Sequence, residues 1–269
     1  DFFIKNHVMN NLNIMPGVAY LNYVLKAARE KGIVVKSLCN LCFIAPLNIG
    51  NSSIEMKVNI GEDNSFVIDS WDGAKIQHHV QGIIESQHTI TFNIMEDEFT
   101  NLDYTISSQD FYEQLRENGL CIGKPFQSVK KLQYDKSKVK ADIVLSEELK
   151  NTLDSFSLHP AVLDGVLQAV ISRDNDSCLH IPFEIKEIRL SGSLSERVIA
   201  YGRKDELTGK WDIKVTDTTN KMLLSIYGLV SKSVQTDASE QNDQEDWIVN
   251  ILTKLTKNEL TVADVENML

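Results

Sequence analysis

Residues 7–17 read His-Val-Met-Asn-Asn-Leu-Asn-Ile-Met-Pro-Gly, and residues 18–31 follow as Val-Ala-Tyr-Leu-Asn-Tyr-Val-Leu-Lys-Ala-Ala-Arg-Glu-Lys. The second segment, wound as a helix, is apolar over most of its surface, which predicts a buried helix. Pro16 suits the first helical position, because an N–H at that position has no intrahelical partner. Gly32 ends the helix after a basic last turn, which suits the negative end of the helix dipole.

The start of this helix is also a candidate binding point. The first N–H groups of a helix have no intrahelical partner, so a helix that starts inside the protein offers donors to a carbonyl oxygen or an anion. Gly17 supplies one of these N–H groups, and His7 lies just upstream. We therefore expect His7 to act on a group that the helix start holds.

Strand patterns follow this helix. Four segments are apolar or alternate between apolar and polar residues, with turn residues between them: 33–46, 53–60, 65–69 and 75–84. Residues 85–108 are predicted to form a linker with one short strand at 89–94. A helix wrapped by a curled antiparallel sheet is the hot-dog architecture.

The same order recurs later in the chain. Pro160 opens a second helix that is apolar nearly all round, and strands are predicted at 179–190, 197–202, 211–215 and 222–230. This repetition predicts an α+β fold of the double hot-dog type, with the two sheets joined edge to edge. Residues 1–97 form the N-terminal half, and residues 98–232 form a linker helix and the C-terminal half.

The second helix carries a polar pair. Asp164 and Gln168 are four residues apart and so share a face of the helix. A carboxyl group among apolar neighbours either is a structural group satisfied by the backbone or serves as an acid, because burial raises its pKa. We favour the functional interpretation.

Composition excludes several classes of function. A formal net charge of −11 argues against a nucleic-acid-binding surface. No apolar run is long enough to cross a bilayer, and the N-terminus lacks a signal-peptide pattern, so we expect a cytoplasmic protein. The abrupt opening suggests a piece excised from a longer polypeptide. Of four cysteines, Cys39 and Cys42 spell C-x-x-C, which we interpret as part of a strand because tetrahedral zinc needs four ligands.

Three motifs resemble those of dehydratase domains from modular polyketide synthases. His7, Pro16 and Gly17 resemble the H-x-x-x-G-x-x-x-x-P motif, although Asn11 stands where the family has glycine; asparagine tolerates the positive φ that such a turn needs. Residues 159–168 match H-P-x-x-x-D-x-x-x-Q/H at every fixed position.

The third motif is eroded. Residues 119–126 resemble G-x-x-Y-G-P-x-F, with Ile122 in place of the tyrosine and the proline displaced by one position to Pro125, while Phe126 matches. His79 aligns with a histidine near a strand end of the family, where it either lines the substrate site or is an ordinary strand histidine at a sheet edge. The resemblance covers residues 1–232.

The resemblance implies a hydro-lyase that removes water from a 3-hydroxyacyl thioester and forms the 2-enoyl thioester. His7 would be the base and Asp164 the acid. The residues expected to bind the substrate are Pro16, Gly17, His79, Ile122, Phe126 and Gln168. The substrate would arrive on the phosphopantetheine of an acyl carrier protein, with no metal or organic cofactor, and the domain would work beside the other domains of its synthase as a homodimer.

Two other functions stay open. An enoyl isomerase, which moves the double bond from α,β to β,γ, would use the same scaffold and needs only the histidine. A non-catalytic double hot-dog kept for binding or assembly would account for the departures at Asn11 and Ile122.

The end of the chain has a different composition. Residues 233–245 contain no large apolar residue and are predicted to be a linker. Residues 246–269 are predicted to form two short amphipathic helices, which resemble the linking and docking segments of polyketide synthases. Such helices cannot bury their own apolar stripes, so they either pack against a partner or form a chain end that is floppy in isolation.

Overall fold

The computed structural model describes residues 2–49, 54–71, 73, 75–87, 94–174 and 178–234. The chain divides into two compact units, Asp1–Val234 and Gln235–Leu269, and every described residue belongs to the first. Most of the predicted linker at 233–245 and the whole predicted tail at 246–269 therefore lie outside the described residues, as does most of the strand predicted at 89–94.

The described helices are α1 (Phe2–Lys5), α2 (Gly17–Glu30), η1 (Glu96–Phe99), α3 (Ser108–Glu117), η2 (Lys124–Phe126), η3 (Glu147–Ser155) and α4 (Pro160–Ile171). The described strands are β1 (His7–Met9), β2 (Leu12–Asn13), β3 (Ser37–Phe43), β4 (Glu55–Ile60), β5 (Ser65–Trp71), β6 (Ile76–Glu85), β7 (Tyr104–Ser107), β8 (Leu120–Ile122), β9 (Val129–Tyr134), β10 (Lys138–Val144), β11 (Leu179–Leu190), β12 (Arg197–Lys204), β13 (Trp211–Thr216) and β14 (Met222–Val234).

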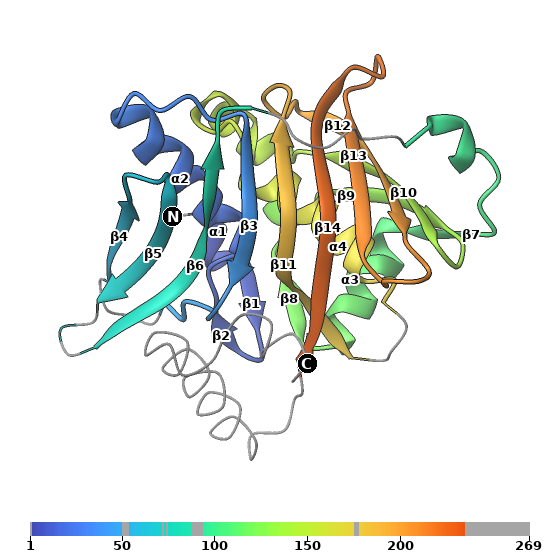
Figure 1. Cartoon of the computed structure of the whole chain (residues 1–269). Helices are drawn as coiled ribbons and strands as arrows, with labels where there is room; N and C mark the ends of the chain where they lie inside the picture. The colour runs from blue at the N-terminus through green and yellow to red at the C-terminus, as the bar shows by residue number, and fades with distance from the viewer. Residues whose placement is uncertain are drawn as a thin grey trace. The chain divides into compact units, whose positions relative to one another are not determined.

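One large antiparallel sheet dominates the fold. Its order is β4-β5-β6-β3-β11-β14-β13-β12-β10-β9-β7, and Figure 1 shows the sheet in front with the helices behind it. The first four strands in this order come from the N-terminal half and the other seven from the C-terminal half. The halves join where β3 pairs with β11, for example Leu38 opposite Ile188. The predicted edge-to-edge double hot-dog is confirmed.

The two proline-initiated helices form the centre of the core. All twelve residues of α4 are buried, and the helix contacts β9, β10, β11 and β12. Strand β10 shows why: Val139, Ala141 and Ile143 alternate toward the core, as one face of a strand must. In α2 the first turns are buried and the last turn is partly exposed, so the prediction of burial holds for its N-terminal part.

The structure corrects several predicted boundaries. Pro16 is the N-cap of α2 rather than its first helical residue, although Gly32 ends the helix with φ 73° as predicted. The predicted linker at 85–108 contains an unpredicted strand, β7, which pairs with β9. Strand β14 extends to Val234 and so includes the first residues of the predicted linker.

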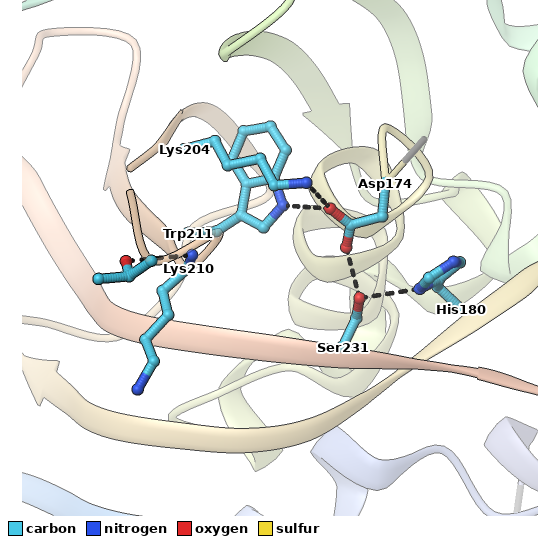
Figure 2. A network of polar contacts seen from close by, with 7 residues as sticks. Asp174, His180, Lys204, Lys210, Trp211 and Ser231 are labelled. Carbon is cyan, nitrogen blue, oxygen red and sulfur yellow. Dashed lines mark hydrogen bonds and ion pairs between the residues drawn. The ribbon is translucent and has the colours of Figure 1, made fainter. Parts of the chain in front are cut away.

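The C-terminal end of α4 is tied to the sheet by the network in Figure 2. Asp174 accepts hydrogen bonds from Trp211 Nε1 at 2.9 Å and from Lys204 Nζ at 2.5 Å. Its other carboxylate oxygen accepts from the Ser231 hydroxyl, which lies 3.0 Å from His180 Nδ1. One carboxylate therefore connects the helix end with β12, β13 and β14, and through Ser231 with β11.

We expect the Asp174→Ala substitution to lower the free energy of unfolding by about 2–4 kcal/mol, because it leaves the buried Trp211 N–H without its acceptor and Lys204 without its partner. Urea unfolding at neutral pH measures this. Glu206→Ala, at an exposed position, is the control and should leave the midpoint unchanged. Equal midpoints for both variants would show that the network is dispensable.

Candidate active site

His7 is held by a strand pair that the sequence does not reveal. It begins β1, which pairs antiparallel with β2 on one side and β8 on the other, and Ile122 lies directly opposite His7. Two further backbone bonds flank this pairing, from Gly123 N to Asn6 O and from Asn10 N to Gly119 O, both 2.9 Å. Segments separated by more than a hundred residues thus meet at the imidazole.

The turn between β1 and β2 explains how asparagine is tolerated in the first motif. Asn10 and Asn11 have φ values of 47° and 65°. Two consecutive residues with positive φ suit a two-residue hairpin turn, and asparagine adopts this conformation more readily than other residues with side chains. Asparagine thus adopts the positive φ that the sequence predicts for this turn.

The hydrogen bonds of His7 fix its tautomer. Nδ1 lies 3.1 Å from the carbonyl oxygen of Ile14, and a carbonyl oxygen can only accept, so Nδ1 carries the hydrogen. Burial lowers the pKa of His7 from 6.5 to about 4, which keeps the ring neutral at pH 7. Nε2 therefore presents an unprotonated lone pair.

Asp164 has the opposite protonation state. Burial raises its pKa from 3.8 to about 8, and the hydrogen bond from Gln168 offsets only part of this effect. Gln168 Nε2 donates to Asp164 Oδ2, so the carboxyl proton belongs on Oδ1. The predicted pairing of Asp164 with Gln168 on one helix face is present, and the carboxyl group is neutral at pH 7.

The two groups face each other. His7 Nε2 lies 3.9 Å from Asp164 Oδ1, with side-chain exposures of 12% and 9%. This separation is too long for a direct hydrogen bond, and because both groups are neutral it is no ion pair. The arrangement places an unprotonated base next to a protonated acid in a largely buried site.

The start of α2 lies beside the ring of Phe43. A Cβ on Gly17 would come within 3.1 Å of two atoms of that ring, so glycine is the residue that fits without displacing it. Pro16 accepts a hydrogen bond from Ala19 N at 2.9 Å, which closes the first turn. The Gly17 N–H is among the helix-start donors that have no intrahelical acceptor.

The remaining predicted site residues lie in different surroundings. Ile122 is 8% exposed and neighbours His7 across β1 and β8, whereas Phe126 is fully buried with its ring 6.1 Å from that of Phe2. His79 is not at a sheet edge, because β6 lies between β5 and β3.

Both ring nitrogens of His79 are engaged. Nδ1 lies 2.9 Å from Ala45 O, Nε2 lies 2.7 Å from Ser70 Oγ, and the ring stacks on Tyr20. His159 is similarly enclosed: its Nε2 lies 2.9 Å from Thr152 Oγ1 and its ring stacks on Phe2, with no side-chain capping bond. These contacts favour packing roles for both histidines.

One polar contact between the halves involves a residue outside the sequence motifs. Asn22 of α2 bonds to the backbone of Leu158, just before α4. An amide side chain among the mostly apolar residues 18–25 is the sequence signal for it.

Comparisons with known proteins decide the family. The model of the family described as "Polyketide synthase dehydratase N-terminal domain" matches residues 99–241, more than half of the chain. The chain belongs to the polyketide synthase dehydratase family. The matched region of this dehydratase-family chain includes Asp164 and Gln168.

Curated relatives agree with this assignment. The chain is 26% identical over 260 residues to polyketide synthase PksM of Bacillus subtilis (strain 168), covering 85% of this chain and 6% of PksM. It is 23% identical over 269 residues to PksN of the same strain, covering 91% of this chain and 5% of PksN. The dehydratase-family chain thus spans about a twentieth of the length of these synthases.

Solved structures agree in fold. The dehydratase domain of the CurF module of curacin polyketide synthase superposes with a TM-score of 0.77 at 21% identity, covering 87% of this chain and 89% of that one. The CurK-module dehydratase gives 0.75 at 23% identity, covering 88% and 89%. Two further matches are inactive mutants of the CurK dehydratase, one with a histidine changed to phenylalanine and one with an aspartate changed to asparagine.

The sequence predictions on cysteines, metal ligands and membrane-spanning helices can be compared with the described residues. Cys39 and Cys42 lie on β3, as the strand interpretation predicts, and both are free thiols, as is Cys121. Within the described ranges no group of three or more His, Cys, Asp and Glu side chains could hold a metal ion. In the same ranges no helix is long and apolar enough to cross a membrane.

The raised pKa of Asp164 predicts a stability effect. The unfolded chain ionises this carboxyl above about pH 4 while the folded chain keeps its proton until about pH 8, so folding binds a proton and stability falls as pH rises through this window. We expect Asp164→Asn to raise the free energy of unfolding by about 2–4 kcal/mol at pH 8 and to change it little at pH 4.

Urea unfolding at both pH values measures this, with Asp154→Asn at an exposed position as the matched control. A variant that is no more stable than the wild type at pH 8 would show that Asp164 is ionised there.

Proposed function

We propose that this domain dehydrates a 3-hydroxyacyl thioester to the 2-enoyl thioester within a polyketide synthase module. The observation that carries the proposal is the pairing of a neutral imidazole with a protonated carboxyl, 3.9 Å apart and largely buried. Elimination of water needs a base at the α-carbon and an acid at the leaving hydroxyl, and each group is in the required state at pH 7.

The groups have separate tasks. His7 Nε2 takes the α-proton, and the electron pair of that C–H bond forms the α,β double bond. The bond between the β-carbon and the hydroxyl oxygen breaks as Asp164 Oδ1 delivers its proton, so water leaves. Transfer of the proton from His7 to Asp164 then restores the starting state, and no oxidant or reductant is needed.

Two further groups assist this step. The Gly17 N–H would donate to the thioester oxygen, on which negative charge develops as the α-proton leaves. Gln168 occupies Oδ2 of Asp164 and so leaves the protonated Oδ1 toward His7. Pro16, Ile122 and Phe126 would shape the substrate site, Ile122 from directly beside His7.

The inactive CurK mutants support these roles by analogy, since one lacks a histidine and the other an aspartate. The substrate would be delivered on the phosphopantetheine of an acyl carrier protein, with the other domains of the synthase as neighbours. We further propose a cytoplasmic homodimer that uses no cofactor of its own. The great length of the curated relatives supports a multidomain setting.

Mass spectrometry of a 3-hydroxyacyl carrier protein after incubation with the domain tests the proposal. We expect the wild type to produce the species that has lost one water, and His7→Ala and Asp164→Asn each to reduce the rate by about 10²–10⁴-fold. Incubation with the enoyl carrier protein is the parallel arm, because an isomerase would move its double bond. Water loss at wild-type rate in either variant would refute the roles, and bond migration without water loss would indicate the isomerase.

A further inference from the structure

The amide of Asn22 forms a two-point bridge between the halves of the fold. Its Nδ2 donates to the carbonyl oxygen of Leu158 at 2.6 Å, and its Oδ1 lies 3.3 Å from the Leu158 N–H. Asn22 lies on α2, five residues after Gly17, and Leu158 lies six residues before Asp164. The bridge therefore connects the helix that starts at the proposed oxyanion donor with the helix that carries the proposed acid.

The bridge supplies a directional contact between the helices, which the hydrophobic effect alone does not. Every residue of α4 is buried, and the hydrophobic effect that favours this burial is non-directional. Hydrogen bonds are directional. Leu158 is fully buried, so its backbone groups need partners, and Asn22 supplies both.

The other site groups are anchored independently of Asn22. His7 is held through β1 by β8, and Asp164 belongs to α4, so both are fixed by the C-terminal half of the fold. Gly17 belongs to α2, which meets the C-terminal half through its packing on α4 and through the Asn22 bridge. Loss of the bridge would remove the directional contact between α2 and the segment before α4, while β1 and α4 keep their own contacts. We therefore expect the oxyanion donor to be less precisely aligned with the acid and the base.

We propose that Asn22 is a positioning residue that aligns the Gly17 N–H with the His7–Asp164 pair. This inference rests on the proposed dehydratase function. It predicts a defect in turnover rather than in substrate binding, because the Gly17 donor acts on charge that develops in the transition state.

The test compares Asn22→Ala with Ser108→Ala in steady-state dehydration of a 3-hydroxybutyryl N-acetylcysteamine thioester. Ser108 is a matched control, since its hydroxyl also donates to a backbone carbonyl, Val129 O at 2.6 Å, but within the C-terminal half. We expect Asn22→Ala to lower kcat by at least about tenfold with KM within about threefold, and Ser108→Ala to retain kcat. Urea unfolding of both variants gives the folded fraction.

Asn22→Asp keeps the shape of the side chain and serves if Asn22→Ala does not fold. The protonated form of the introduced carboxyl can still donate to Leu158 O, whereas its ionised form faces that carbonyl oxygen without a hydrogen. Its kcat relative to wild type should therefore rise as pH falls from 7 to 5. A merely structural role predicts a loss that follows the unfolded fraction.

Wild-type kcat in folded Asn22→Ala, or a ratio for Asn22→Asp that does not change with pH, would overturn the inference and leave the dehydratase function standing. A folded wild type that releases no water from the thioester would overturn both.

Discussion

The pairing of β1 with β8 is the constraint on which the site depends. It places His7 opposite Ile122 and so brings the first residues of the chain against the C-terminal half, where α4 presents Asp164. Without this small sheet the imidazole would lose the strand neighbours that hold it beside α4. The large sheet, whose halves join at β3 and β11, forms most of the fold. The three-stranded sheet of β1, β2 and β8 holds His7 in its position near Asp164.

Burial then sets the protonation states. The same exclusion of water that lowers the pKa of His7 raises that of Asp164, so the pair holds one transferable proton without a formal charge. An ionised carboxylate beside an imidazolium would exchange the two protonation states, so His7 could not take the α-proton and Asp164 could not protonate the hydroxyl. The poise needed for catalysis is therefore reached at the expense of stability at neutral and basic pH, a common trade in active sites.

Much of this could be predicted from local sequence signals. Pro16, Gly32 and Pro160 mark helix boundaries because of their own backbone chemistry, and the spacing of Asp164 and Gln168 places them on one helix face. The C-terminal strands β11 to β14 follow apolar patterns close to their observed bounds. These features depend on residues that are close in sequence, so a local sequence pattern can predict them.

The features that sequence did not reveal depend on partners far along the chain. Strands β1 and β8 have three residues each, too few to show a period, and their pairing joins residues such as Val8 and Cys121. The sequence is compatible with a sheet-edge position for His79, but its strand β6 lies between β5 and β3. Asn22 forms a hydrogen bond with Leu158 of the other half, and no local sequence pattern predicts this partner.

The most direct test of the account is an NMR titration of the wild-type domain with labelled histidine rings and aspartate carboxyls. The account predicts that His7 stays neutral, with its hydrogen on Nδ1, down to a pKa of about 4, and that Asp164 keeps its proton up to a pKa of about 8. Titration of His7 near 6.5 together with Asp164 near 3.8 would mean an ordinary solvated ion pair, and would contradict the proposed acid and base.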